Sequence, residues 1–185
     1  LVYAKSSKGS TFIDRTIIHI LKFKRKKSQI VNFREIIGAD EIAFDNVINN
    51  IPCGSLYRWP YKYYHSDKDT IERVDINSFN EHMEVLKELI FIIENNAIFY
   101  NKFKHLPKLS HPKINLYISE TDSYKETWLD SNKKQMLQCL VPALANGETS
   151  ILDLAERCNL PFRFVNNYLT SFYPKMILEE WEKVK

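Results

Sequence analysis

Residues 38–70 carry three short motifs around which the rest of the chain is organised. They read Gly38-Ala39-Asp40-Glu41, then Asn50-Ile51-Pro52-Cys53-Gly54-Ser55-Leu56, and then Tyr64-His65-Ser66-Asp67-Lys68-Asp69-Thr70. Carboxylates, hydroxyls, a thiol and an imidazole gather here more densely than elsewhere in the sequence. We therefore expect a functional site within this stretch.

His65 is the candidate metal ligand of the stretch. It lies between an aromatic run and two aspartates, namely Trp59, Tyr61, Tyr63, Tyr64, Asp67 and Asp69. One imidazole nitrogen can bind a metal ion while a nearby carboxylate orients the other nitrogen, as in most metal-binding histidines. A histidine beside two aspartates is also common in solvent-exposed loops, and the spacing alone leaves both interpretations open.

The order of the motifs resembles the co-catalytic zinc aminopeptidases. In that family a Gly-x-Asp-Glu turn follows a strand, an apolar phrase ends in Ile-Pro, and a short strand leads to Tyr-His-Thr-x-x-Asp-Thr. The chain is still more similar to the aminopeptidase-like proteins of bacterial polysaccharide-biosynthesis clusters, whose pattern adds Pro-x-Gly-Ser-Leu and an arginine. Those places are held by Pro52, Gly54, Ser55, Leu56 and Arg58, while Ser66 replaces the usual threonine.

The resemblance runs from about Tyr3 to the C-terminus and covers the second half of the family's catalytic domain. It implies an α/β fold, part of a zinc-peptidase-like (phosphorylase/hydrolase-like) mixed sheet with flanking helices, followed by a small winged helix domain. The predicted division is 1–105 for the α/β part, 106–128 for a linker and 129–185 for a winged helix-turn-helix domain.

Six residues receive roles from the resemblance: His65 as a zinc ligand with Asp69 behind it, Asp40 and Glu41 as catalytic residues, and Arg58 and Tyr64 as substrate-binding residues. The sequence also allows simpler readings. The alternative for Glu41 is a solvated acidic loop, and Arg58 can bind a substrate carboxylate bidentately or pair with a structural acid.

Zinc is the cofactor that the resemblance implies for the intact protein. The family takes its other ligands from an early His-x-Asp, a Glu-Glu pair and a further Asp, and nothing before His65 supplies them. One imidazole cannot hold the ion against water. We therefore expect an inactive, metal-free chain that forms the C-terminal portion of a zinc-dependent aminopeptidase-like hydrolase, which cleaves a peptide or amide bond by metal-activated water.

Composition indicates a globular protein rather than a fibrous or disordered one. The 185 residues are 44% hydrophobic and 13% aromatic, enough to bury a core. A formal charge of +3 is too small to indicate nucleic acid or an anionic membrane. Three widely spaced cysteines and the lack of a membrane-length apolar run favour a cytoplasmic location.

Periodicity predicts strands at residues 1–4, 29–33 and 53–57, and a helix from Thr11 onward with Ser10 as its N-cap. A basic run ends that helix, Lys22, Lys24, Arg25, Lys26 and Lys27. This run could attract phosphate. However, the helix dipole favours cations at a helix C-terminus, and we prefer this structural interpretation. A long helix begins near Asp75 or Asn77, with an apolar face predicted to pack across the sheet: Phe79, Met83, Leu86, Leu89, Ile90 and Ile93.

The C-terminal part is predicted to be helical. A helix over 129–145 is predicted to be kinked or shortened by Pro142, Ser150 caps a helix over Ile151–Cys158, and Pro161 begins a third. A hairpin strand over 175–178 would complete a winged helix-turn-helix.

The partners of this part follow from its charge and aromatic content. Residues 129–185 hold seven basic and seven acidic side chains, and this balance disfavours DNA binding. An aromatic excess predicts docking on the α/β part or on a second copy: Phe162, Phe164, Tyr168, Phe172, Tyr173 and Trp181. The alternative function is a non-catalytic DNA- or protein-binding winged-helix protein.

Overall fold

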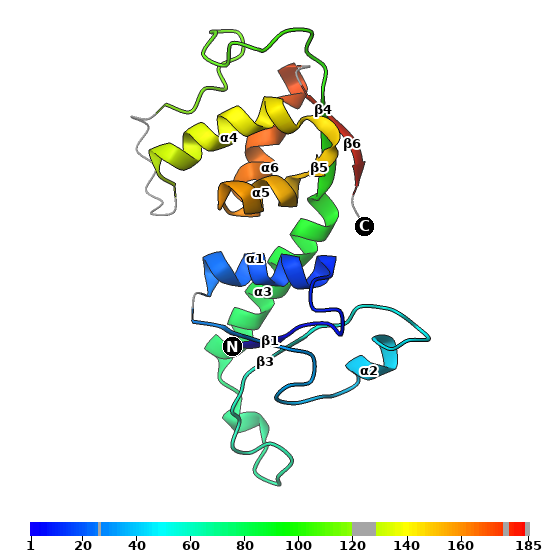
Figure 1. Ribbon diagram of the computed structural model, residues 1–185. Helices are drawn as coiled ribbons and strands as arrows, with labels where there is room; N and C mark the ends of the chain where they lie inside the picture. The colour runs from blue at the N-terminus through cyan, green and yellow to red at the C-terminus, as the bar shows by residue number, and fades with distance from the viewer. Residues whose placement is uncertain (26, 120–128, 176–177, 184–185) are drawn as a thin grey trace. The chain divides into compact units, whose positions relative to one another are not determined.

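A computed structural model describes residues 1–25, 27–119, 129–175 and 178–183 (Figure 1). Contacts divide the chain into two compact units, Leu1–Ile90 and Phe91–Lys185. Each unit has a three-stranded sheet and helices of its own. The mixture of helices and strands confirms the predicted α/β class.

The sheet of the first unit is mixed. Its central strand, β1 (Val2–Ala4), runs parallel to β2 (Gln29–Val31) and antiparallel to β3 (Ser55–Tyr57), in the order β2-β1-β3. All three strands fall within the predicted ranges. Their apolar side chains form a small core together with neighbouring loop residues, and the members are Val2, Ala4, Val31, Ile36, Tyr57 and Trp59.

Helix α1 (Phe12–Lys24) connects β1 to β2 and begins one residue later than predicted. Thr11, not Ser10, is its N-cap, because the Asp14 carboxylate accepts hydrogen bonds from the Thr11 backbone N–H at 2.9 Å and hydroxyl at 2.6 Å. This reciprocal pairing of the first helical turn satisfies donors that would otherwise lack partners.

The loop after β2 contains the short helix α2 (Glu41–Phe44), and a 3₁₀ turn, η1 (Ile71–Arg73), precedes α3 (Ile76–Asn95). Asp75 caps α3, as predicted, by accepting a hydrogen bond from the Ser78 backbone N–H at 2.9 Å.

The predicted apolar face of α3 is wrong. Phe79, Leu86, Ile90 and Ile93 are exposed, whereas the helix buries Val85, Glu88 and Ile92. Helix α3 is apolar on two faces, so its sequence does not show which one packs inward. Within the first unit, the buried Glu88 lies near the end of α1, where Lys24 forms an ion pair with it at 3.4 Å.

The second unit pairs strands that are far apart in the sequence. Its central strand, β4 (Ala97–Asn101), lies antiparallel to β5 (Asn146–Ser150) and β6 (Leu178–Lys183), in the order β5-β4-β6. Strands β4 and β5 were not predicted. Because β4 pairs within the second unit, the contacts divide the chain inside α3, earlier than residues 106–128. The predicted division at 1–105, 106–128 and 129–185 remains a prediction about independent domains.

Three helices accompany this sheet: α4 (Ser131–Leu144), α5 (Ile151–Cys158) and α6 (Phe162–Thr170). Helices α4 and α5 contact the sheet, and α6 packs against α5. Ser150 caps α5 as predicted, with its hydroxyl 3.2 Å from the Asp153 backbone N–H. Pro161 is the N-cap of α6 rather than its first residue, and Pro142 lies inside α4 without ending it.

The winged helix-turn-helix assignment remains a prediction. A 3₁₀ turn, η2 (Tyr173–Lys175), stands where the hairpin strand was expected to begin, and residues 176–177 lie outside the described residues. Strand β6 pairs with β4, a strand that precedes all three helices.

The aromatic excess predicted for this part is smaller than expected. Phe162 and Phe172 are fully buried within the second unit, and Phe164, Tyr168 and Tyr173 are half-buried. The side chain of Trp181 lies outside the described residues. The predicted docking of this part on another surface, and its weak DNA binding, stay predictions.

Among the described residues, no helix has both the length and the apolar character needed to cross a membrane.

Candidate functional site

A pocket of about 210 Å³ in the first unit brings together segments from all three motifs. Its walls are mostly apolar and aromatic, and they consist of Ile37, Gly38, Ala39, Ser55, Tyr57, Arg58, Trp59, Tyr61 and Tyr64. Strand β3 and the loops that precede and follow it provide most of these residues. Both predicted substrate-binding residues, Arg58 and Tyr64, therefore line one cavity.

Glu41 is directed into the loop rather than into solvent. It is only 6% exposed, and one carboxylate oxygen forms an ion pair with Arg34 at 2.7 Å while the other accepts the Ala39 backbone N–H at 2.7 Å. The solvated-loop reading of Glu41 is thus wrong. In this structure both carboxylate oxygens hold the loop that lines the pocket. The predicted catalytic role of Glu41 remains untested.

Gly38 leaves room for the Arg34 side chain in this arrangement. A Cβ atom at Gly38 would lie 2.3 Å from the Arg34 guanidinium carbon, so the guanidinium group would have to shift if a side chain were added there. Asp40, by contrast, is exposed at the start of α2, and its carboxylate makes no capping hydrogen bond. Of the two predicted catalytic acids, only Asp40 presents its carboxylate to solvent.

His65 lies on an exposed turn beside the pocket. Its backbone is left-handed, with φ of 55°, and its ring stacks on Tyr64 with the ring centroids 4.0 Å apart. Tyr64 in turn meets Trp59 edge to face at 5.9 Å. One aromatic side chain therefore separates the imidazole from the pocket interior.

Asp69 contacts a tyrosine of the pocket. Its carboxylate accepts a hydrogen bond from the Tyr61 hydroxyl at 2.6 Å, which raises the pKa of Tyr61. Because Asp69 is held by Tyr61, the structure does not show it orienting His65 as predicted. The bond instead fixes Tyr61 as a wall of the pocket.

Arg58 forms an ion pair with Glu81 of α3, which is the structural alternative that the sequence left open. Its side chain nonetheless lines the pocket, so a role in substrate binding stays a prediction.

A buried acid behind the site, Asp14, was not predicted. It accepts the Tyr3 hydroxyl at 2.8 Å and the Ser6 backbone N–H at 2.7 Å, in addition to its bonds with Thr11. Burial alone would raise the pKa of Asp14, but the hydrogen bonds from Ser6 and Thr11 outweigh burial and hold that pKa below its usual value.

Asp45 anchors the loop between α2 and β3 in the same way. It accepts the Ser7 backbone N–H at 2.8 Å and the Cys53 backbone N–H at 3.1 Å. Burial acts to raise the pKa of Asp45, yet hydrogen bonds from Ser7 and Cys53 lower it overall. The polar residues that follow β1 were the available sequence signal for both anchors, because a loop leaving a buried strand needs such partners.

The region that contains this site matches a known sequence family. The family described as "Domain of unknown function (DUF4910)" matches residues 1–96, about half of the chain. The chain belongs to the DUF4910 family. The match includes all of the pocket and the strands and helices that support it.

The fold of this DUF4910 chain has a counterpart among solved structures. A crystal structure of a Clostridium acetobutylicum protein named "putative peptidase" is similar, with a TM-score of 0.76 and 21% sequence identity. The similarity covers 97% of this chain and 38% of that protein, so the chain spans well under half of its length. The two proteins share a fold over this part. Among curated proteins, none matches the sequence.

The described residues of the DUF4910 chain do not form a complete metal site. No cluster of three or more histidine, cysteine, aspartate or glutamate side chains occurs in the parts that the structure describes. A protein zinc site needs three or four such ligands, and His65 can provide one. Zinc binding by His65 therefore remains a prediction.

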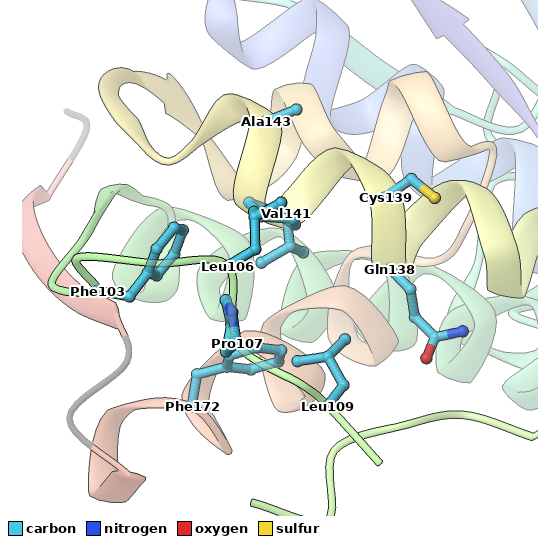
Figure 2. A pocket seen from close by; sticks show the side chains of 10 residues that line it. Phe103, Leu106, Pro107, Leu109, Gln138, Cys139, Val141, Ala143 and Phe172 are labelled. Atoms are coloured by element: carbon cyan, nitrogen blue, oxygen red, sulfur yellow. The ribbon is translucent and has the colours of Figure 1, made fainter. Parts of the chain in front are cut away.

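A second pocket, of about 420 Å³, lies in the second unit between α4 and the segment that follows β4. Figure 2 shows Phe103, Leu106 and Pro107 of that segment facing α4 residues, with Phe172 beside them. Its lining is almost entirely apolar, and it contains none of the predicted site residues. The pocket at β3 is consequently the better candidate site.

Proposed function

We propose that this chain is the C-terminal portion of a zinc-dependent, aminopeptidase-like hydrolase of peptide or amide bonds. The observation that carries the proposal is the pocket at β3, where the three motifs converge around Arg58 and Tyr64. The similarity to a protein named as a peptidase supports it. The remaining zinc ligands would lie outside the described residues.

In this proposal the chain's own residues bind and orient the substrate. The aromatic walls fit an apolar group, and burying one such side chain is worth about 1.5–3 kcal/mol. Tyr61 and Arg58 are held in place by Asp69 and Glu81, so the walls are set before a ligand enters. Asp40 is the acid left free to face a substrate amine.

Exposed apolar surface supports the idea that more protein packs on this chain. Val47 is 98% and Ile48 is 89% exposed in the loop after α2, and Phe79 and Leu86 are exposed on α3. Contiguous exposed apolar residues usually mark an interface. The related structure is long enough to include a partner for such an interface, since the similar part covers only 38% of its length.

The decisive test is His65→Ala in the complete gene product. We expect loss of hydrolytic activity and of bound zinc with a change in unfolding free energy within about 0.5 kcal/mol, because an exposed side chain contributes little to the core. Activity on amino-acid amides, zinc content by elemental analysis and urea unfolding measure the three effects.

His105→Ala is the matched control, since His105 is also exposed but lies outside the site. It should leave zinc, activity and stability unchanged. Full zinc content in the His65→Ala protein would contradict the assignment.

A further inference from the structure

A separate pocket of about 310 Å³ in the first unit is lined by cationic side chains from several elements. Arg25 caps the C-terminal end of α1, Lys27 and Ser28 lie between α1 and β2, Arg58 follows β3, and Glu81 comes from α3. Leu1 completes the lining. Four segments of the chain thus converge on one small volume.

The side chains of this pocket carry excess positive charge. Arg25, Lys27 and Arg58 contribute three positive charges and Glu81 one negative charge, which leaves +2. The Glu81 carboxylate bonds to Arg58 and lies 4.0 Å from Nε of Arg25, so one acid serves two guanidinium groups. Lys24, nearby on α1, is already paired with Glu84 and Glu88 and is not part of the excess.

Three hydrogen-bond donors of the pocket are buried without an acceptor among the described residues. They are Nε of Arg25, Nε of Arg58 and the hydroxyl of Ser28. The 4.0 Å between Arg25 and Glu81 is too long for a hydrogen bond. Buried donors are nearly always satisfied, and all three of these lie on residues that line the same cavity.

We propose that this pocket binds a phosphate group. A phosphate monoester carries about −1.5 to −2 charges at pH 7 and offers several acceptor oxygens, which match both the net charge and the number of free donors. Arginine forks bind phosphate oxygens in defined geometry. A carboxylate is a poorer match, because it brings one charge and two oxygens to a pocket that already contains the Glu81 carboxylate.

The phosphate pocket meets the candidate site at Arg58, which lines both cavities. A ligand with an apolar body and a phosphate could therefore reach both. The phosphate proposal does not depend on hydrolysis, since Arg25, Lys27 and Ser28 lie outside the candidate site. Failure of one proposal leaves the other standing.

The test compares sodium phosphate with sodium chloride and sodium acetate at equal ionic strength and pH 7, using the 185-residue chain. We expect a saturable rise in melting temperature with phosphate alone, because a ligand that binds the folded state stabilises it by mass action. The Nε–H resonances of Arg25 and Arg58 in arginine-labelled protein should shift over the same concentrations. Equal effects of acetate, or no saturable effect of phosphate, would overturn the proposal.

Arg25→Gln should weaken phosphate binding at least tenfold. Lys22→Gln, the matched control, removes one charge from the same end of α1 outside the pocket and should leave binding unchanged. Equal weakening in both variants would assign the effect to diffuse charge and overturn the site. Ser28→Ala changes no charge, so it should weaken binding about threefold even if Arg25→Gln fails to fold, and unchanged phosphate binding in a folded Ser28→Ala chain would also overturn the site.

Discussion

Asp14 illustrates how a single buried carboxylate fixes the loop that follows β1. It accepts five hydrogen bonds, one from Tyr3 and two each from Ser6 and Thr11. These hydrogen bonds stabilise the ionised carboxylate. The same bonds therefore lower the pKa of Asp14 and fix the conformation of the loop.

Asp14→Asn should destabilise the chain by about 2–4 kcal/mol at pH 7, because an amide presents its own N–H groups to these donors. The folded-state pKa of Asp14 lies below its unfolded value of about 3.9, so its stabilising effect is complete above that pH and is lost as the pH falls through the folded pKa. Urea unfolding at pH 7, 4 and 3 should therefore show a shallower loss of stability in the variant.

Asp67→Asn provides the comparison for that experiment, since Asp67 is exposed. Its unfolding free energy should stay within about 0.5 kcal/mol of the parent chain. A similar cost for both substitutions would mean that the Asp14 network contributes nothing specific.

Gly54 is the second residue whose identity is set by a neighbour. A Cβ atom at Gly54 would lie 2.2 Å from the Tyr3 hydroxyl oxygen, and Tyr3 is fully buried and bonded to Asp14. Gly54→Ala should therefore cost about 1–3 kcal/mol through overpacking, measured by urea unfolding.

A double-mutant cycle with Tyr3→Phe isolates the contact. Removing the hydroxyl takes away the nearest atom, so Gly54→Ala should cost less in that background. Strictly additive effects would mean that the clash is with the ring carbons of Tyr3, two of which lie 2.7 Å from the added Cβ atom, and not with the hydroxyl.

At this scale the sequence predicts which residues gather at the site but not what each one contacts. Arg58 and Tyr64 were assigned to substrate binding, and they do line one pocket. The partners of Glu41 and Asp69, which are Arg34 and Tyr61, depend on loop conformations that side-chain chemistry alone does not determine.

Among the elements, α3 shows most clearly where periodicity fails. Adjacent isoleucines on this helix have opposite environments, since Ile92 is fully buried and Ile93 is 41% exposed. Ile92→Ala should cost about 2–5 kcal/mol in urea unfolding, and Ile93→Ala, its matched control, about 1 kcal/mol or less. Equal costs would mean that the face of α3 that carries Ile93 is as buried as the face that carries Ile92.

Helix α5 is the opposite case, because local signals determine both of its ends. Ser150 and Asp153 form a capping box at the start, and Asn159 ends the helix in a left-handed conformation. The sequence predicted its bounds correctly. Strand β4 was missed because its partners β5 and β6 are about 50 and 80 residues away, a pairing that no short window of sequence contains.

At the scale of the whole molecule, the two units differ in how much apolar surface they enclose. The second unit buries a large set of aliphatic and aromatic side chains around α5. The described part of the first unit buries a smaller set, which consists of Val2, Tyr3, Ala4, Ile17, Ile20, Leu21, Val31 and Val85. A sheet of three short strands needs such packing partners to be stable. That difference fits the proposal that the first unit is completed by further protein.

The exposed stripe on α3 makes this proposal measurable. Phe79 and Leu86 are 53% and 42% exposed, so replacing both by glutamine should leave the unfolding free energy of the 185-residue chain within about 1 kcal/mol, because little buried surface is lost. In the complete gene product the same pair should cost about 3 kcal/mol or more, since large-to-small changes at buried positions are expensive.

Lys87→Gln changes an exposed residue outside the stripe. It should leave the unfolding free energy of both the 185-residue chain and the complete gene product unchanged. Sedimentation velocity gives a second readout: the isolated chain should self-associate through the uncovered stripe as its concentration rises, and Phe79→Gln with Leu86→Gln should reduce that association. If the double substitution destabilises the short chain and the complete protein equally, the stripe is covered within these 185 residues. In that case the first unit is complete as it stands, and the need for additional protein disappears.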